Sequence, residues 1–209
     1  MSVMPRVIDI AFDVGCEAIE EAAAVLGEGG LVVMPTDTVY GVAADPSLDI
    51  AVARIYGAKR RDPEKPLPLL AGDLRDVLEF GATLGKCEME LAGRFWPGPL
   101  TLVVRAGDVE EGFRVPDHEV ALTLLRKAGG ILRVTSANMS GQPEALTAEA
   151  AVEALGDSVD LVLDAGPVPG GTPSSVIRIV DGKVEMLRAG ALNSEVIASV
   201  VDACRGNLE

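Results

Sequence analysis

Histidine, cysteine and aromatic residues are scarce in this chain of 209 residues, and each scarcity excludes a class of site. His118 is the only histidine, which excludes metal centres built on several histidines and argues against a Ser-His-Asp hydrolase. Its position predicts a turn before a helix. Cys16, Cys87 and Cys204 are odd in number and form no CxxC pair, which predicts free thiols rather than a disulfide framework or a zinc site.

Long hydrophobic runs are also missing, because no apolar stretch approaches the roughly 20 residues of a membrane span. The N-terminus, MSVMPRVIDI, lacks the apolar core of a signal peptide. We therefore expect a cytosolic protein without membrane contact. With seven aromatic residues and 48% hydrophobic ones, the core must be built from Val, Leu, Ile and Ala.

Positive charge is in deficit, since 18 Lys and Arg stand against 32 Asp and Glu and the net charge is −14. Because phosphates are neutralised by a field of opposite sign, this balance argues against a broad nucleic-acid-binding face. A local basic cluster is then informative, and four of the 18 cations fall within Lys59–Lys65. The sequence has neither GxxxxGK[ST] nor GxGxxG, so any ATP site is neither a P-loop nor a typical dinucleotide site.

What the chain does have is an apolar run that turns at once into polar residues, at Leu31–Gly41, LVVMPTDTVYG. The run predicts an internal strand, and the polar residues after Pro35 then lie at its carboxyl edge, where ligands bind in open α/β sheets. Alternatively, the two threonines and Asp37 only satisfy backbone groups of a turn, and the motif alone does not decide. The same pattern returns at Ile131–Thr135, which runs into TSANMSG.

Helical and strand patterns alternate along the rest of the chain. Spacings of three and four residues predict helices over 15–29, from 47 onward, 73–80, 85–95, 117–128, 147–155 and 193–204. Apolar runs predict strands over 67–71, 100–105, 113–115 and 160–163, and Asp181-Gly182 predicts a hairpin between Val176–Val180 and Lys183–Leu187. In the second helix the spacing places Lys59 at the margin of the buried face. The alternation predicts one α/β domain over 1–209 with a mixed sheet.

Three loops hold polar residues without an obvious structural need, namely Thr36–Tyr40, Lys59–Lys65 and Ser136–Ser140, and two arginines, Arg114 and Arg188, stand at strand ends. Hydroxyls, an amide and several cations together suit a polyphosphate or carboxylate ligand. Each loop alone could equally be a solvated turn.

These motifs resemble the YrdC/Sua5 family over about residues 15–192. The matching strings, in the family's order and spacing, are PTDTVYG, Lys59-Arg60-Arg61 with Lys65-Pro66-Leu67, FWPGPLTLV, FRVPDH, TSANMSG, PSSV and RAGA. The resemblance implies a YrdC/RibB-like fold: one domain with a twisted open mixed sheet, flanked by helices, around a large concave and locally positive cavity. Longer relatives add a C-terminal domain, and we expect the single-domain form here.

Members of the family are L-threonylcarbamoyladenylate synthases, which combine L-threonine, bicarbonate and ATP into threonylcarbamoyl-AMP and pyrophosphate for the t6A modification of tRNA. The resemblance implies that Lys59 and Arg61 are catalytic and that these two bind ATP together with Ser136, Asn138 and Arg188. It implies that Thr36, Arg114 and Ser174 bind threonine. Ser175 and Ala189 depart mildly from the family's motifs.

The resemblance also implies Mg²⁺ bound with ATP, no organic cofactor and no dedicated metal site, with Asp37 the nearest metal candidate. Expected partners are the downstream tRNA threonylcarbamoyl-transfer machinery and a weak or indirect contact with tRNA or double-stranded RNA. Two alternatives remain open: a carbamoyl-adenylate-forming module, and a non-catalytic RNA- or nucleotide-binding paralogue. The intact motifs favour the enzyme, and the net charge weakens the RNA alternative.

Overall fold

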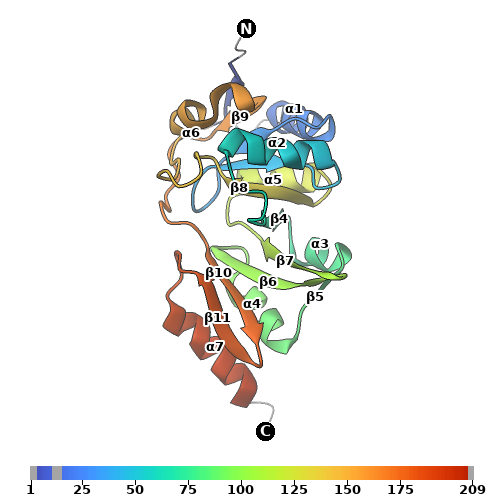
Figure 1. The fold of residues 1–209 in the computed structure, drawn as a ribbon, viewed down its shortest axis with the longest axis vertical. Coiled ribbons are helices and arrows are strands. Elements are labelled where there is room, and N and C mark those ends of the chain that lie inside the picture. The colour runs from blue at the N-terminus through green and yellow to red at the C-terminus, as the bar shows by residue number, and fades with distance from the viewer. Residues whose placement is uncertain (1–3, 11–15, 207–209) are drawn as a thin grey trace.

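An eleven-stranded mixed sheet runs through both halves of the molecule, as the computed structural model shows in Figure 1. The structure describes residues 4–10 and 16–206. The strand order is β1-β9-β2-β3-β8-β4-β7-β6-β10-β11, with β5 paired to β6. The sheet contains both parallel pairs (β1/β9, β2/β9, β4/β7, β6/β10) and antiparallel pairs (β2/β3, β3/β8, β8/β4, β7/β6, β10/β11, β5/β6), which confirms the predicted mixed sheet.

The elements follow one another along the chain with short connections. The strands are β1 Arg6–Asp9, β2 Val32–Met34, β3 Gly41–Ala44, β4 Leu69–Ala71, β5 Ala82–Thr83, β6 Leu100–Ala106, β7 Val109–Arg114, β8 Ile131–Ser136, β9 Leu161–Asp164, β10 Ser175–Val180 and β11 Lys183–Arg188. The helices are α1 Cys16–Gly27, α2 Asp49–Lys59, α3 Leu74–Glu79, α4 Lys86–Phe95, α5 Glu119–Lys127, α6 Ala148–Leu155 and α7 Ser194–Gly206, with a 3₁₀ turn at Gly156–Ser158.

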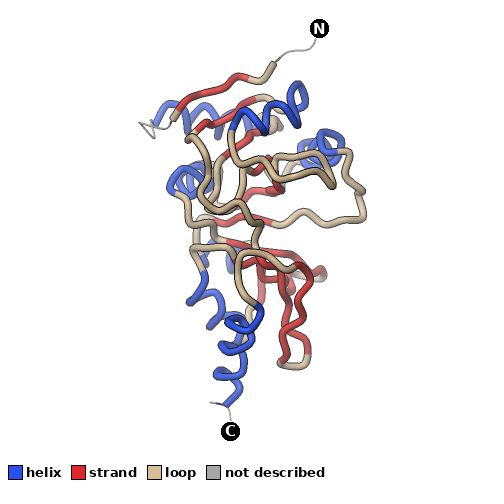
Figure 2. Tube along the Cα trace, turned by 90° about the vertical axis from the view of Figure 1, so that its left-hand side faces the viewer, coloured by secondary structure: helices blue, strands red, loops and turns tan. Residues whose placement is uncertain are grey.

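The part of the sheet formed by β1, β9, β2, β3 and β8 is covered by helices on both faces, which explains the continuous apolar run of β2. Successive side chains of a strand point to opposite faces. Val32 and Met34 pack with α1 and α5, whereas Leu31 and Val33 pack with α2 and α6 on the other face. Figure 2 shows helices on both sides of the strands in this part.

The other part of the sheet, formed by β7, β6, β10 and β11, is covered by helices on one face only. Leu100, Leu102 and Ile177 of β6 and β10 pack against α4 and α7. The alternate residues of the same strands, Thr101 and Val176, line a cavity on the opposite face. Figure 2 shows the helices of this part on one side of its strands.

Several predicted features need correction. The strands β1, β3 and β5 were not predicted, and β7 is longer than the predicted Phe113–Val115. β3 matters most, because it pairs antiparallel with β2 and so makes Pro35–Tyr40 the connection between two adjacent strands. The predicted helices and the Asp181-Gly182 hairpin are confirmed within a few residues.

The expectations for His118 and the cysteines can be compared with this fold. His118 directly precedes α5, as predicted. Cys87 and Cys204 are buried free thiols whose sulfurs lie 2.8 Å apart between α4 and α7, and the side chain of Cys16 lies outside the described residues. Within the described ranges, no helix is long and apolar enough to cross a membrane.

Candidate functional site

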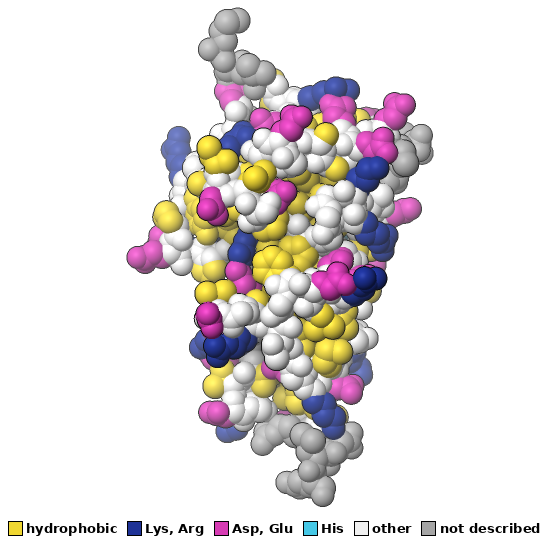
Figure 3. All heavy atoms as spheres, turned by 90° about the vertical axis from the view of Figure 1, so that its right-hand side faces the viewer, with side chains coloured by type: hydrophobic (Ala, Val, Ile, Leu, Met, Phe, Trp, Pro, Cys, Tyr) yellow, Lys and Arg dark blue, Asp and Glu magenta, His cyan; other side chains and the backbone are white. Residues whose placement is uncertain are grey.

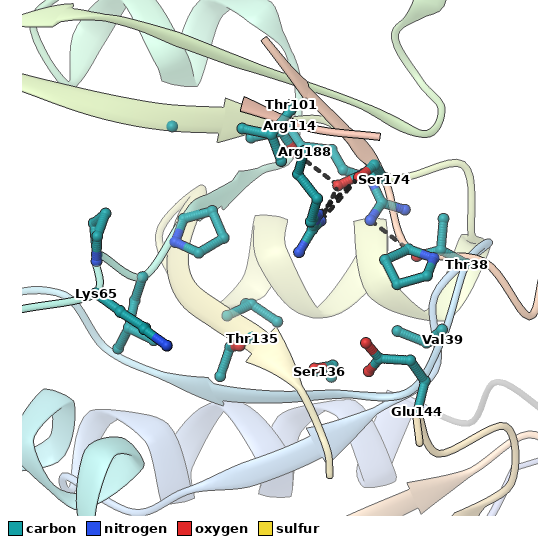
Figure 4. Close-up of a pocket in the computed structure, with 18 of the residues that line it drawn as sticks. Thr38, Val39, Lys65, Thr101, Arg114, Thr135, Ser136, Glu144, Ser174 and Arg188 are labelled. Atoms are coloured by element: carbon teal, nitrogen blue, oxygen red, sulfur yellow. Dashed lines mark hydrogen bonds between the residues drawn. The ribbon is translucent and has the colours of Figure 1, made fainter. Parts of the chain in front are cut away.

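One cavity of about 720 Å³ collects all eight of the residues that the sequence singled out. It lies where the two parts of the sheet meet, and its walls come from the 36–41 loop, the end of α2, β6, β7, the end of β8 and the 173–188 segment. Figure 4 shows Arg188 and Ser174 entering from one side and Ser136 and Glu144 from the other. The predicted residues in its lining are Thr36, Lys59, Arg61, Arg114, Ser136, Asn138, Ser174 and Arg188.

The Thr36 hydroxyl is already fully bonded within its own loop. It donates to the Val39 carbonyl (2.7 Å) and accepts the backbone N–H groups of Thr38 and Val39, both at 3.2 Å. A hydroxyl offers one donor and two acceptor positions, so these bonds use its capacity. Thr36, which is 2% exposed, therefore shapes the loop in the way that the turn interpretation predicts, while it also lines the cavity.

Arg114, at the end of β7, joins three separate segments. Its Nε donates to the Gly98 carbonyl (3.0 Å), one terminal nitrogen donates to the Thr38 hydroxyl (3.0 Å), and the other forms an ion pair with Asp37. Asp37 also accepts the backbone N–H of Asp117 (3.1 Å). Burial lowers the pKa of Arg114, and Asp37 opposes this shift. The FWPGP and PTDT motifs thus meet through one guanidinium.

Lys59 is the last residue of α2 and is 2% exposed, so it lies inside the buried face rather than at its margin. Its ammonium donates to the carbonyls of Ser136 (2.5 Å) and Asn138, and to the Asn138 side-chain oxygen (3.2 Å). An ammonium has three donors, and all three are occupied. Lys59 therefore fixes the 136–138 loop against α2.

Ser136 and Asn138 form one hydrogen-bonded unit with Lys59. The Ser136 hydroxyl donates to the Asn138 side-chain oxygen, and the Asn138 amide nitrogen donates to the Gln142 carbonyl, each at 2.5 Å. A further backbone bond joins Ser140 N–H to the Lys59 carbonyl (3.1 Å). The KxR and SxN motifs are consequently one structural element, although 75 residues separate Arg61 from Ser136.

Arg188 and Ser174 form the opposite wall of the cavity. The guanidinium of Arg188 donates to the Ser174 carbonyl (2.9 and 3.2 Å) and to its hydroxyl (3.0 Å), and this hydroxyl also bonds that of Thr101 (2.8 Å). Gly190 lies against this segment so closely that a Cβ there would overlap the backbone at Pro173–Ser175. Arg61, partly exposed, donates to the carbonyls of Lys65 and Pro66 at the rim.

The cations of the cavity stand close enough to repel one another. Burial lowers the pKa of Lys59 to about 8 and also lowers that of Arg188, and the charge of Arg61 lowers both further. Glu144 opposes these shifts. An anion placed between the cations would relieve their repulsion, so the site suits a polyanionic ligand.

A metal site built from the protein alone does not fit these residues. Asp37, the nearest predicted candidate, is held by Arg114 and the Asp117 N–H. Among the residues that the structure describes, no group of three His, Cys, Asp or Glu could hold a metal ion. Mg²⁺ would therefore have to arrive with a ligand that carries its own oxygens.

Among the lining residues that sequence reasoning did not single out, Thr101 and Glu144 matter most for the site. Thr101 sits in the FWPGPLTLV motif, but its hydroxyl became visible as a Ser174 partner only in the fold. Glu144 follows the TSANMSG loop without any motif signal, yet its carboxylate points into the cavity (Figure 4).

The family model that matches this chain is that of the Sua5, YciO and YrdC proteins, described as "Telomere recombination", and it covers residues 24–190. A protein of Mycobacterium leprae is 37% identical over an alignment of 216 positions, gaps included, that covers 98% of each chain. The threonylcarbamoyl-AMP synthase of Bacillus subtilis is 34% identical over 194 residues, which cover 88% of this chain and 56% of that protein.

The structural comparison agrees with the sequence comparison. The crystal structure of Pyrococcus abyssi Sua5 complexed with L-threonine matches with a TM-score of 0.87 and 34% identity, over 93% of this chain and 60% of that one. The chain thus spans nearly all of the mycobacterial relative, but little more than half of the Bacillus and Pyrococcus proteins. Both comparisons lead to one conclusion: the chain belongs to the Sua5/YciO/YrdC family.

Proposed function

We propose that this protein is an L-threonylcarbamoyladenylate synthase, which makes threonylcarbamoyl-AMP and pyrophosphate from L-threonine, bicarbonate or CO₂ and ATP. The observation that carries the proposal is the convergence of eight motif residues, from five segments of the chain, on one cavity. Relatives named threonylcarbamoyl-AMP synthase and a Sua5 structure with L-threonine support the substrate assignment.

The cationic part of the cavity is the proposed ATP site. Lys59, Arg61 and Arg188 supply positive charge for the phosphates, and Ser136 and Asn138 position the nucleotide. Since the Lys59 donors are occupied, we assign it two tasks: it fixes the SxN loop and it contributes charge. Arg61, at the rim, is the cation that can turn toward a phosphate at the smallest structural cost.

The proposed threonine site adjoins the ATP site at the contact between Ser174 and Arg188. Ser174 presents a hydroxyl that Arg188 and Thr101 orient, and Thr36 and Arg114 build the adjoining loop. The hydroxyl of Thr36 is fully bonded, and each of the three nitrogens of the Arg114 guanidinium already donates one hydrogen bond, so these two residues act mainly through the shape and charge of the loop. Mg²⁺ accompanies ATP as part of the substrate.

The reaction needs an anionic oxygen to attack the α-phosphorus of ATP, and the substrates can supply it. The threonine ammonium loses a proton to become an amine, which adds to CO₂ and releases a second proton to solvent, so that a carbamate forms. A carbamate oxygen then attacks the α-phosphorus, the bond from that phosphorus to the oxygen bridging to the β-phosphate breaks, and pyrophosphate leaves. The protein contributes positioning and charge stabilisation, as in other phosphoryl and nucleotidyl transfers. The product would then pass to the tRNA threonylcarbamoyl-transfer machinery, with at most a weak contact with RNA by this protein itself.

An omission experiment tests the proposal. Pyrophosphate release and incorporation of radiolabelled bicarbonate into an acid-labile nucleotide adduct are followed together while one component at a time is left out. We expect both signals only when L-threonine, bicarbonate and ATP are all present. Pyrophosphate release without threonine would contradict the proposal. Activity with carbamoyl phosphate in place of threonine and bicarbonate would instead support the carbamoyl-adenylate-forming module.

A further inference from the structure

Glu144 has a buried carboxylate oxygen, Oε2, with no hydrogen-bond partner among the described residues. Its side chain lines the cavity and points into it (Figure 4). A buried polar atom without a partner costs free energy that a bonded one does not. A ligand that brings a donor to this oxygen would recover that free energy.

The donor that fits Glu144 is positively charged. A phosphate would be repelled by the carboxylate, and the charge of Glu144 instead stabilises the protonated forms of Lys59 and Arg188. The other carboxylate in the lining, that of Glu110, is exposed and pairs with Arg178 at 3.1 Å. Glu144 thus marks a place for a cation inside a cavity whose other charges favour anions.

The position of Glu144 ties it to the 36–40 loop rather than to the rim. The carbonyl of the next residue, Ala145, accepts the backbone N–H of Tyr40 (2.9 Å), and Tyr40 O in turn accepts Ala137 N–H (2.8 Å). Across the cavity stands the Ser174 hydroxyl, which belongs to the proposed threonine site and accepts a hydrogen bond from Arg188 (3.0 Å). A hydroxyl held beside a guanidinium can bind a carboxylate. An α-amino acid carries an ammonium and a carboxylate, so it matches this pair of walls.

We propose that Glu144 receives the ammonium group of the amino-acid substrate and so positions the nitrogen that attacks CO₂. Before the attack the ammonium gives one proton to the Glu144 carboxylate, and the nitrogen releases a second proton to water as the N–C bond forms and the carbamate results. The inference rests on the proposed function, because it assigns the substrate of that site. It makes Glu144 a specificity residue: ligands that lack the amine gain nothing from it. Magnesium is the other cation that one carboxylate could attract, and the experiment separates the two.

The test is calorimetric titration of L-threonine into the wild type, Glu144→Gln and the matched control Glu110→Gln. Loss of a charge-assisted hydrogen bond should weaken L-threonine binding by about 10- to 100-fold in Glu144→Gln and leave Glu110→Gln within about twofold of the wild type. The analogue 2,3-dihydroxybutanoate, in which a hydroxyl replaces the amine, should bind the wild type and Glu144→Gln equally weakly. On the wild type alone, L-threonine should bind more tightly than this analogue, because only L-threonine carries the amine.

The outcomes are distinguishable. Equal L-threonine affinity in the wild type and Glu144→Gln overturns the role of Glu144 and leaves the proposed function intact. Restoration of Glu144→Gln turnover by added magnesium, with unchanged threonine affinity, assigns the carboxylate to the metal and also overturns the inference. Absence of L-threonine binding to the wild type overturns both the inference and the proposed function.

Discussion

Burial makes Lys59 a structural residue as well as a charged one. Its ammonium donates to three oxygen acceptors of the 136–138 loop, and truncation would remove this donor from the buried carbonyls of Ser136 and Asn138. The helical spacing predicts only a position at the margin of the buried face. Arg61 is more exposed, and its partners are two carbonyls at the rim.

We therefore predict that Lys59→Ala and Arg61→Ala differ in stability while both lose turnover. Lys59→Ala should lower the free energy of unfolding by about 3 kcal/mol, because buried acceptors are left unpaired. Arg61→Ala should change it by less than about 0.5 kcal/mol. Urea unfolding measures the stability and pyrophosphate release measures the turnover. The control is Lys183→Ala, at an exposed lysine outside the cavity lining. Equal stability of the two variants would contradict the buried role of Lys59.

The pKa of Lys59 predicts a pH dependence of ATP binding. Burial lowers this pKa from 10.5 to about 8, with Arg61 adding to the shift and Glu144 opposing it. The protonated form is the one that attracts phosphates, so ATP affinity should fall as the pH rises through about 8. Titrations of ATP into the protein at several values between about pH 6.5 and pH 9.5 measure this affinity. The fall in affinity should be absent in Lys59→Met. A flat wild-type profile would show that the Lys59 charge does not contribute to ATP binding.

At the scale of elements, the turn between β11 and α7 supports the Ser174 wall. Gly190 has no room for a Cβ, because Pro173–Ser175 passes directly beside it. The Ala191 N–H donates to the Pro173 carbonyl (2.9 Å) and fixes this approach. The RAGA motif (188–191) and the PSSV motif (173–176) therefore pack directly against each other.

Gly190→Ala should push the 173–175 segment away and disturb the hydroxyl of Ser174. Overpacking of this kind costs about 1–3 kcal/mol of stability, and we expect weaker L-threonine binding as well. Thermal unfolding and threonine titration check the two effects. The control is Gly93→Ala in α4, where nothing lies within 4 Å of the added Cβ and helix propensity should favour alanine by about 1 kcal/mol. Normal threonine binding by Gly190→Ala would show that the contact between Gly190 and the 173–175 segment does not position Ser174 for threonine.

The elements that sequence reasoning found are those with a strong local signal. The helices α1, α4 and α5 show apolar residues at three- and four-residue spacing, and β2 is an uninterrupted apolar run. β3, with the sequence GVAA, carries no such signal, because its strand state comes from pairing with β2 and β8 on either side. The formation of β3 therefore depends on its neighbouring strands rather than on its own sequence.

The candidate site was predictable in membership but not in detail. The resemblance to the YrdC/Sua5 family implied eight site residues, and all eight are in the cavity lining. The resemblance could not show that the Thr36 hydroxyl and the Lys59 ammonium are already bonded, since the Lys59 partners lie 77 and 79 residues away. Glu144 had no local signal at all.

At the scale of the whole molecule, the acidic surface and the cationic cavity oppose each other. The net charge is −14, and on the face in Figure 3 acidic and basic side chains are interspersed. Five basic residues line the cavity: Lys59, Arg61, Lys65, Arg114 and Arg188. The site can attract a small polyanion while the outer surface repels a long one.

We predict weak tRNA binding without sequence preference. Few phosphates can reach the cavity cations, so log K against log salt should have a shallow slope, about −2 to −4. Fluorescence anisotropy with labelled tRNA at several salt concentrations measures it, and single-stranded RNA of equal length is the control. Tight binding with a steep slope would restore the alternative of a non-catalytic RNA-binding protein.

The late position of Ser174 and Arg188 in the chain has a consequence for synthesis. β10 pairs with β6 and β11, so the wall that these residues form is the last part of the cavity to be made. A nascent chain in which the Lys59 and Asn138 segments have already left the ribosome still lacks this wall. We expect a newly made protein to acquire its ligands only after the final hairpin has left the ribosome, so that translation itself delays the start of activity.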